Sequence, residues 1–381
     1  MKMLQDSLLR TAIWVLVGLS LSLTSCGGRE GARPTSPLLA AGDAHTVVIR
    51  RDGTLWAWGW NCFGQLGNGT NIDSNTPVQV GTDTKWQSVS AGYGYTIAIK
   101  KDGTLWGWGV NEIGQLGDGT NKNRNRPVQI ATDAKWRSVF AGRLHTLAIK
   151  TDGTLWAWGW NDIGQLGNTT KQESHTPVQI GTDTQWRSAA AGADHTVAIK
   201  NDGTLWTWGA NHSGELGNGT NESSYAPVRV GTETNWLSVR AGWYTMAIKK
   251  DGTLWAWGWN FYGLLGNGKN IDSNTPLQVG TSTGWRSISA GGEHTVGIRK
   301  DGTLWVWGHN DSGQFGNGTN MDSHTPIQIG QDAEWLSAEA GMRYTVATKK
   351  DGTLWAWGLN QNGQLGNGKN KNNHTPVQIG N

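Results

Sequence analysis

The chain has few cysteines, few charges and no long apolar run beyond its first residues. Its 381 residues include only two cysteines, Cys26 and Cys62, so a disulfide framework cannot be the basis of the fold. Charged residues make up 16 % of the chain, and the net charge is +3. The basic residues recur singly or in pairs, as at Arg50-Arg51 and Lys349-Lys350, and form no concentrated stripe. Nucleic-acid binding, which requires such a stripe, is therefore not predicted.

Glycine and tryptophan, in contrast, are abundant because one unit recurs along the chain. The sequence Asp-Gly-Thr-Leu-Trp-x-Trp-Gly occurs seven times, at a period of 50 residues with one interval of 49. Its aspartates are Asp52, Asp102, Asp152, Asp202, Asp251, Asp301 and Asp351. A period of 40–50 residues with several strand-like runs per unit is typical of β-propeller blades. The sequence therefore predicts an all-β fold, a seven-bladed β-propeller with one repeat per blade.

Each unit contains four segments with the residue pattern of a strand. In the second unit these are Trp86–Gly92, Tyr95–Lys100, Leu105–Gly109 and Arg126–Ile130. The Asp-Gly pair between the second and third segments predicts a two-residue hairpin with positive φ at both residues. The small residues of the first segment suit the crowded axis of the ring, and the proline of the fourth suits a strand start or an edge. We therefore expect the first strand to be innermost and the fourth outermost, and the order leaves open how the ring closes.

Most of the 25 tryptophans belong to the repeat. Fourteen form the seven Trp-x-Trp pairs, and six more recur once per unit as Trp86, Trp136, Trp186, Trp236, Trp285 and Trp335. Large flat side chains are suited to packing one twisted sheet against the next. We interpret this majority as filling between blades.

Alignment of the seven units with one another separates structural positions from functional ones. A residue that every blade needs recurs in every unit, whereas a site that is used once should break the repeat. One column contains His45, His145, His195, His294, Tyr95, Tyr244 and Tyr344. A column that accepts His or Tyr favours a ring whose polar tip makes a hydrogen bond, and not a metal ligand. We predict no metal site, no cofactor and no catalytic residue, since no serine, histidine and carboxylate set departs from the repeat.

Two columns break the repeat, and both fall at predicted turns. The turn after the first strand carries Tyr93, Arg143, Trp243, Glu293 and Arg343, and the position after Trp-Gly carries Trp60, Trp160 and Trp259. We expect the first set to surround the mouth of the central channel. Aromatic, arginine and acidic residues together are typical of a recognition surface. These eight residues are the predicted partner-binding positions, and unselected variation of loops is the alternative interpretation.

The repeat also resembles that of a known family. The motif Gly59-Trp60-Asn61-x-x-Gly64-Gln65-Leu66-Gly67, together with Ala91-Gly92 and His145-Thr146, is similar to the regulator of chromosome condensation repeat. The resemblance covers Leu38–Asn381 and implies a seven-bladed propeller, a fold that serves as a scaffold for unrelated activities. The founding member exchanges nucleotide on a nuclear GTPase and binds chromatin, but this chain has no insertion outside the repeat and no basic tail. A light-sensing branch uses a Gly-Trp-Arg-His-Thr motif, which is absent here, so photoreception is not predicted.

The first 37 residues have a different composition. Lys2 and Arg10 precede the apolar stretch Thr11–Leu23, which is typical of a signal-peptide core and too short for a stable membrane anchor. The sequence Leu23-Thr24-Ser25-Cys26 resembles a bacterial lipobox, in which the chain is cut before a cysteine that then carries lipid. We expect a lipoprotein signal peptide over 1–25, lipidation at Cys26, a flexible tether over 26–37 and the propeller over 38–381. An ordinary cleaved signal is the alternative.

Together these features predict a bacterial cell-envelope lipoprotein, with the outer membrane favoured, that contacts the membrane through its lipid anchor only. Its propeller is predicted to be a non-catalytic protein-interaction scaffold. The alternative is a carbohydrate-binding module in which exposed Trp and Tyr on one propeller face stack on sugar rings. Cys62 lies in a column that accepts any residue and is interpreted as an incidental surface thiol.

Overall fold

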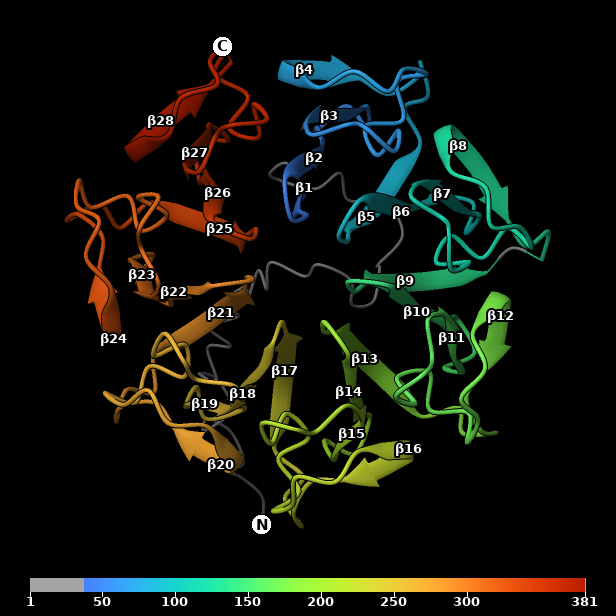
Figure 1. Ribbon diagram of the computed structural model, residues 1–381. Coiled ribbons are helices and arrows are strands. Elements are labelled where there is room, and N and C mark those ends of the chain that lie inside the picture. Colours follow the sequence, from blue (N-terminus) through green and yellow to red (C-terminus); the bar gives the residue numbers. More distant parts are fainter. Residues whose placement is uncertain (1–37, 134, 381) are drawn as a thin grey trace, which may run out of the picture.

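The computed structural model describes residues 38–133 and 135–380, and in this part of the chain 28 strands form seven four-stranded antiparallel sheets around a central axis (Figure 1). The predicted seven-bladed β-propeller is confirmed. Blade 1 contains β1 (Leu38–Ala41), β2 (His45–Ile49), β3 (Leu55–Gly59) and β4 (Ser74–Gln79); blade 2 contains β5 (Trp86–Ala91), β6 (Tyr95–Lys100), β7 (Leu105–Gly109) and β8 (Arg124–Ile130). Blade 3 contains β9 (Trp136–Ala141), β10 (His145–Lys150), β11 (Leu155–Gly159) and β12 (Ser174–Gln179); blade 4 contains β13 (Trp186–Ala191), β14 (His195–Lys200), β15 (Leu205–Gly209) and β16 (Ser224–Arg229). Blade 5 contains β17 (Trp236–Ala241), β18 (Tyr244–Lys249), β19 (Leu254–Gly258) and β20 (Ser273–Gln278); blade 6 contains β21 (Trp285–Ala290), β22 (His294–Arg299), β23 (Leu304–Gly308) and β24 (Ser323–Gln328). Blade 7 contains β25 (Trp335–Ala340), β26 (Tyr344–Lys349), β27 (Leu354–Gly358) and β28 (Asn373–Ile379).

The strand order within each blade follows the chain, as expected. The first strand of every blade lies next to the axis and the fourth forms the outer edge, as β1 and β4 show in Figure 1. Because the strands alternate in direction, the turn after the first strand and the loop after the third lie on the same face of the ring. The hairpins between the second and third strands lie on the opposite face. This arrangement places the two variable columns of the sequence on one face.

The hairpin turns differ from the prediction in their type. In blade 2, Gly103 N donates to Lys100 O (2.9 Å), and Lys100 N donates to Thr104 O (3.0 Å), so the loop has three residues. Only the glycine has positive φ, at 81° for Gly103, whereas Asp102 does not. This is a type I turn followed by a left-handed glycine, the three-residue alternative to the predicted two-residue turn. The aspartate therefore needs no positive φ, and its carboxylate accepts hydrogen bonds from Thr104.

The outer strands also begin earlier than their prolines. β4 starts at Ser74, so Pro77 lies inside the strand and not at its first residue. The pairing of β3 with β4 shifts register between Ala57 and Gly59, where the ladder is interrupted. A proline is tolerated there because the strand is at the sheet edge and next to a bulge.

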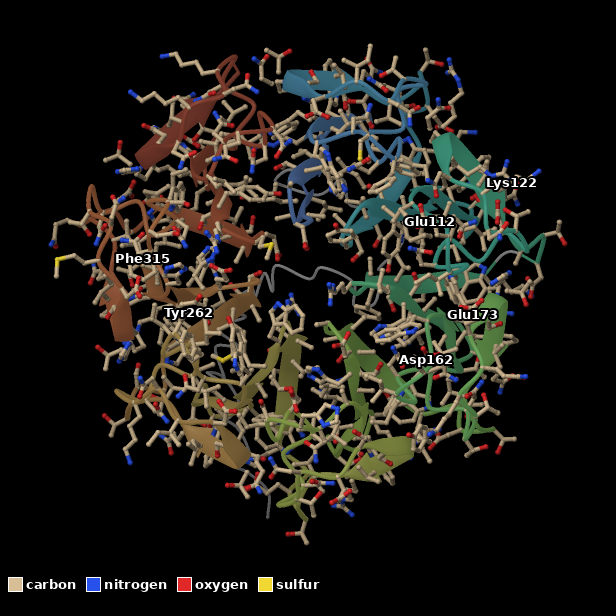
Figure 2. The ribbon with its side chains drawn as sticks, viewed as in Figure 1. Glu112, Lys122, Asp162, Glu173, Tyr262 and Phe315 are labelled. Carbon is tan, nitrogen blue, oxygen red and sulfur yellow. The ribbon has the colours of Figure 1, made fainter. Side chains whose placement is uncertain are left out.

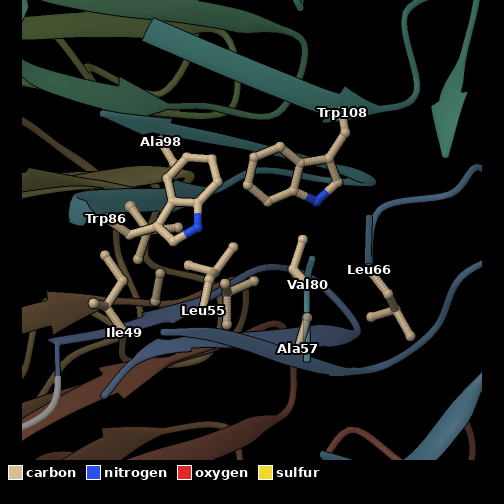
Figure 3. Packing of buried hydrophobic residues seen from close by; sticks show 11 residues of the cluster. Ile49, Leu55, Ala57, Leu66, Val80, Trp86, Ala98 and Trp108 are labelled. Atoms are coloured by element: carbon tan, nitrogen blue, oxygen red, sulfur yellow. The ribbon is translucent and has the colours of Figure 1, made fainter. Parts of the chain in front are cut away.

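The core consists of tryptophan clusters between neighbouring blades, as interpreted from the sequence. Figure 3 shows Trp86 and Trp108 of blade 2 above Leu55 and Val80 of blade 1, and all four are buried. The Trp86 ring meets the Trp108 ring edge-on at a centroid distance of 5.8 Å. Each blade therefore presents tryptophan rings to an aliphatic wall of the preceding blade, and the edge-to-face contacts add to the area buried.

The Asp-Gly-Thr-Leu-Trp motif forms a series of hydrogen bonds at the hairpin of each blade. Asp102 Oδ1 accepts from Thr104 Oγ1 (2.6 Å), and Thr104 Oγ1 accepts from Trp106 Nε1 (2.9 Å). These bonds hold the pKa of Asp102 below its usual range. The ammonium of Lys100 lies 3.8 Å from the centre of the Trp106 ring, a cation–π contact. The motif recurs because every hairpin has this series of hydrogen bonds.

The Gly-Gln-Leu-Gly motif joins each blade to the next. The backbone oxygen of Gln65 in blade 1 accepts from Trp108 Nε1 (2.9 Å) and Thr96 Oγ1 (3.0 Å) in blade 2. The same bonds close the ring, where Gln364 O accepts from Trp58 Nε1 (2.9 Å) and Thr46 Oγ1 (2.9 Å). All seven sheets consist of consecutive strands, so closure uses contacts between blades 7 and 1 and no shared strand.

The predicted signal peptide, the lipidation site Cys26 and the tether lie outside the described residues. Within residues 38–133 and 135–380, no helix is long and apolar enough to cross a membrane.

Candidate binding face

The two variable columns of the sequence meet at the rim of the central channel. In blade 1, Trp60 N donates to Ala44 O (2.8 Å), and in blade 2, Val110 N donates to Gly94 O (2.8 Å). These bonds join the loop after the third strand to the turn after the first strand of the same blade. We call this surface, built from those turns and loops, the channel-mouth face. All eight predicted partner-binding residues belong to it.

A ring of Ala-Gly steps forms the wall of the channel mouth. Glycine is required in this ring because each blade approaches the next closely. A Cβ on Gly92 would lie 2.4 Å from Gly142 O, and one on Gly142 would lie 2.6 Å from Gly192 O. The ring encloses a cavity of about 180 Å³, which Asp43, Tyr93, Arg143, Trp243 and Met342 also line.

Charged and aromatic side chains face one another across this mouth. The guanidinium of Arg143 from blade 3 lies 5.1 Å from the ring centre of Trp243 in blade 5. Burial raises the pKa of Asp43 in blade 1 to about 6, although the positive charge of Arg143 opposes the shift. Three residues from three blades thus share one electrostatic environment, and sequence analysis identified two of them, Arg143 and Trp243.

Below the Ala-Gly ring lies a second cavity of about 160 Å³ that sequence analysis missed. Its polar residues are Ser88, Ser90, Arg240, Ser289 and Glu339, and Ser289 Oγ donates to Glu339 Oε2 (2.8 Å). Burial raises the pKa of Glu339, and Arg240 partly offsets this shift. The signal was present in the sequence, since the column Ala40, Ser90, Phe140, Ala190, Arg240, Ser289 and Glu339 also breaks the repeat. It falls within the first strand and not in a turn.

Blade 5 contributes a continuous aromatic cluster to the face. Trp243 meets Trp259 edge-on at 6.3 Å, and Trp259 lies parallel to Phe261 at 6.2 Å. Tyr262 packs edge-on against Phe261 at 4.9 Å. Sequence analysis identified the two tryptophans but missed Phe261 and Tyr262, whose columns contain mostly polar or small aliphatic residues in the other blades.

A polar network adjoins this cluster in blades 6 and 7. Glu293 Oε2 lies 2.7 Å from Arg343 Nε and 2.8 Å from His309 Nδ1. Arg343 also contacts Asp311 Oδ2 (3.0 Å), and its ionic partners raise its pKa. The His309 ring stacks on Tyr262 at 4.3 Å. The predicted residues Glu293 and Arg343 are therefore brought together, and His309 connects them to the aromatic cluster.

The remaining predicted residues are divided between two places. Trp60 meets Tyr93 edge-on at 5.9 Å and Phe63 at 5.2 Å, which forms a smaller aromatic cluster at blades 1 and 2. Trp160 of blade 3 is half-buried and lies in neither aromatic cluster. The channel-mouth face is thus asymmetric, although the blades beneath it are nearly identical.

Comparison with known families agrees with this geometry. The RCC1-like domain matches residues 29–347, and the regulator of chromosome condensation (RCC1) repeat matches residues 351–381. The chain belongs to the RCC1-like domain family. The resemblance seen in the sequence is therefore confirmed.

Two solved structures share the fold of this chain. Human WBSCR16 superposes with a TM-score of 0.78 at 23 % identity, over 86 % of this chain and 94 % of that chain. Prp20p from Saccharomyces cerevisiae superposes with a TM-score of 0.77 at 22 % identity, over 86 % and 85 % of the two chains. Identities at this level establish the fold alone.

Curated relatives match over short segments. The ultraviolet-B receptor UVR8 of Arabidopsis thaliana is 50 % identical over 42 residues, which is 11 % of this chain and 10 % of the receptor. An X-linked retinitis pigmentosa GTPase regulator homologue of Caenorhabditis elegans is 37 % identical over 62 residues, 16 % of this chain and 4 % of that protein. The chain therefore spans a tenth or less of the length of these relatives.

The His/Tyr column of this RCC1-like propeller has the structural role that the sequence predicted. His45 Nε2 lies 3.0 Å from Thr96 Oγ1 of the next blade, and Tyr95 Oη donates to His145 O (2.7 Å). Both rings are buried, and burial lowers the pKa of His45 to about 3. Among residues 38–133 and 135–380, no three His, Cys, Asp or Glu side chains converge to hold a metal ion.

Proposed function

We propose that this RCC1-like propeller is a non-catalytic scaffold that binds a protein partner through the channel-mouth face. The observation that supports the proposal is the concentration of repeat-breaking side chains on that one face. Arg143 and Trp243 line the mouth from two blades, and Arg343 of a third blade lies on the same face, paired with Glu293. Tryptophan, tyrosine and arginine are the residues that most often carry binding energy in protein interfaces.

The same side chains give little support for catalysis. Glu293 is held by His309 and Arg343, and the buried histidines of the His/Tyr column bond to threonines of the next blade. A nucleophile with an adjacent base, which covalent catalysis would need, is not formed by these groups. Family membership points the same way: a related propeller, Prp20p, is described by its binding to Gsp1p and histones.

We also propose that the protein acts at a bacterial cell envelope, anchored by lipid on Cys26. The support is the sequence alone, namely the apolar stretch Thr11–Leu23 followed by Leu-Thr-Ser-Cys. Cys26→Ala should release the protein from the membrane fraction. Retention of this variant in that fraction would refute the lipid anchor without affecting the proposed binding face.

The proposed binding is tested by a pull-down from solubilised envelope with the lipid-free propeller, residues 34–381. A variant that combines Tyr93→Ala, Arg143→Ala, Trp243→Ala and Arg343→Ala is compared with the parent. We expect a protein retained by the parent and lost by this variant. Equal retention would place the site elsewhere, and no retained protein would contradict the scaffold function.

A matched control changes the opposite face. Lys101 and Lys300 are exposed on the hairpins between second and third strands, away from the channel mouth. The double variant Lys101→Ala, Lys300→Ala should retain the partner as the parent does. Thermal unfolding of all three proteins shows whether any loss of binding reflects loss of fold.

Glycan binding is the second candidate, and the clustering of aromatic rings on the face favours it. Trp60 and Tyr93 are in contact in one cluster, and Trp243 and Trp259 are in contact in the other. This function predicts saturable binding of soluble peptidoglycan fragments that Trp243→Ala or Trp160→Ala abolishes. Fragments that bind both variants as tightly as the parent would exclude it.

A further inference from the structure

The exposed apolar side chains of the channel-mouth face are concentrated in blades 5 and 6. Phe261, Ile271 and Met321 are 63 %, 67 % and 76 % exposed, and Ile72 of blade 1 is the other large apolar side chain that is comparably exposed among the described residues. In the same columns, blades 2 and 3 carry Glu112, Asp162, Lys122 and Gln172. Figure 2 shows Glu112, Lys122 and Asp162 on the side of the ring opposite Tyr262. Since the blades share one repeat, the difference is specific to the surface and not required by the fold.

Four aromatic rings of blade 5 contact one another, and Ile271 and Met321 lie on the loops of blades 5 and 6; we call the six residues together the blade 5–6 patch. It consists of Trp243, Trp259, Phe261, Tyr262, Ile271 and Met321. Its area is apolar and aromatic, with a methionine, which is the composition of the centre of a protein interface. Exposed apolar groups gathered in this way mark interaction sites more often than scattered ones do.

The backbone beneath the patch is held in place. Asn260 Nδ2 donates to Ile271 O (2.9 Å), which ties the start of the blade 5 loop to its end. Asn310 Nδ2 donates to Met321 O (3.1 Å) in the same way in blade 6. The blade 5 loop is also joined to β24 of blade 6, because Gly268 N donates to His324 O (2.9 Å). A surface whose backbone is already fixed loses little conformational entropy when a ligand binds.

The charged groups around the patch are mainly acidic. Its loops and turns carry four carboxylates, Asp272, Glu293, Asp311 and Asp322, and two cations, Lys269 and Arg343. Asp272 and Asp322 accept from the backbone N–H groups of Asn260 and Asn310, so both lie beside the residues of the patch. The rim therefore attracts basic groups and disfavours a second copy of the same acidic surface.

The polar groups nearest the aromatic rings are already satisfied by one another. Glu293 Oε1 accepts from Arg343 (2.9 Å), and its Oε2 lies within hydrogen-bond distance of His309 Nδ1 (2.8 Å). Sugar hydroxyls would need free donors and acceptors at this position, and Ile271 and Met321 offer no flat ring for stacking. The patch therefore fits an apolar peptide better than it fits a glycan.

We propose that the blade 5–6 patch binds an extended peptide segment whose aliphatic or proline side chains are flanked by lysine or arginine. The proposal rests on the proposed protein-binding function and specifies its site and its ligand chemistry. The apolar side chains cover Phe261 and Met321, and the flanking cations lie over the exposed Asp272 and Asp322. Proline-rich segments suit aromatic-lined surfaces because their extended conformation is already formed.

The test uses a displayed library of random 12-residue peptides selected on the full propeller, followed by dissociation constants of the selected peptides. We expect a consensus of apolar residues with at least one lysine or arginine, and weaker binding at higher salt. Phe261→Asp and Met321→Asp should each weaken binding by about tenfold or more. Gln361→Asp is the matched control, because Gln361 occupies the Phe261 column in blade 7 and the change adds the same charge. It should leave the affinity within about twofold, a difference well below 1 kcal/mol.

Each other result has a defined meaning. Peptides that bind Phe261→Asp as tightly as the parent would refute the patch but leave the proposed scaffold function intact. An acidic consensus, or a library that yields no saturable binder, would also refute it. If the parent binds chitohexaose and Phe261→Asp does not, the ligand of the patch is a glycan and the peptide proposal is wrong. If the parent sediments as a dimer and Phe261→Asp does not, the ligand is a second copy of this chain. Failure of the scaffold function itself is a separate result, because it requires that the envelope pull-down retains no protein.

Discussion

The His/Tyr column shows how a buried position can accept two different side chains. His145 Nε2 bonds to Thr196 Oγ1 of blade 4 (3.0 Å), while Tyr244 Oη bonds to Thr295 Oγ1 of blade 6 (2.6 Å). In each case a flat ring places one polar atom against the threonine of the next blade. The choice between His and Tyr matters for charge, because only histidine gains a proton near neutral pH.

The buried histidines should make the propeller sensitive to acid. Burial lowers the pKa of His45, His145 and His294 to about 3 and that of His195 to about 4, whereas an unfolded histidine titrates near 6.5. The unfolded chain therefore binds more protons than the native one between these values. Stability is lost as the pH falls from about 6.5 toward 3, by about 1.4 kcal/mol per pH unit for each histidine. Asp43 acts in the opposite sense, since its raised pKa of about 6 makes the native state the stronger proton binder between about pH 3.8 and 6.

His145→Tyr tests this account with a residue that the column already accepts. The free energy of unfolding of the variant is measured by urea titration between pH 4 and 6. It should fall less steeply with decreasing pH, by about 1.4 kcal/mol per pH unit, because one fewer proton is taken up on unfolding. Its stability at pH 8 should remain close to that of the parent. A pH dependence identical in both proteins would show that His145 is not the buried neutral group described above.

At the scale of elements, the repeat predicted the strands well because the residue pattern that favours each strand lies within a single unit. The Trp-x-Trp strands, the small inner strands and the edge prolines all follow from local pattern. The hairpin type was predicted wrongly, since Asp102 acts through its carboxylate and not through positive φ. Phe261 and Tyr262 were missed for another reason: their role depends on Trp259 and His309, which only the folded loops bring to them.

The turns around the channel mouth should tolerate no side chain at their glycines. A Cβ at Gly142 would lie 2.6 Å from Gly192 O and 2.9 Å from the Ala191 methyl, and neither neighbour can withdraw without moving the next blade. Gly142→Ala should therefore lower the free energy of unfolding by about 1–3 kcal/mol, as overpacked sites do. Gly284→Ala is the control, because the nearest atom there is Ser282 Oγ at 3.5 Å and the glycine has no positive φ. That variant should stay within about 0.5 kcal/mol of the parent, and equal destabilisation of both by urea titration would contradict the role of the ring.

At the scale of the whole molecule, the candidate site depends on distances that span several blades. The two variable columns were identifiable from the sequence because the internal alignment shows which positions break the repeat. The contacts between those residues were not identifiable from the sequence, since Arg143 reaches Trp243 across the mouth from two blades away. The channel cavity with Arg240 and Glu339 was not predictable for the same reason. Their column is variable in sequence, but only the closed ring brings its residues into one cavity.

The junction between blades 7 and 1 should be the first to open. It has the hydrogen bonds of the other junctions, including Tyr344 Oη to His45 O (2.6 Å) and Gly368 N to Asn75 O (2.8 Å). It lacks, however, the buried tryptophan that begins the first strand of the other six blades, because the sequence has Ser36 in the column of Trp86. The chain also does not run from blade 7 into blade 1, so covalent linkage does not oppose separation there.

Hydrogen exchange measured by mass spectrometry at pH 7 can locate this opening. We expect peptides from β1 and β26 to exchange faster than those from β5 and β21, since local opening governs exchange of buried amides. Trp136→Leu removes the corresponding ring at the junction of blades 2 and 3, at a cost of about 3 kcal/mol or less. It should bring exchange of β6 and β9 toward the rate of the closing junction. If β1 and β26 exchange no faster than the other inner strands in the parent, the missing tryptophan does not decide where the ring opens, and the interblade bonds from Gln364 to Trp58 and Thr46 are sufficient to hold it.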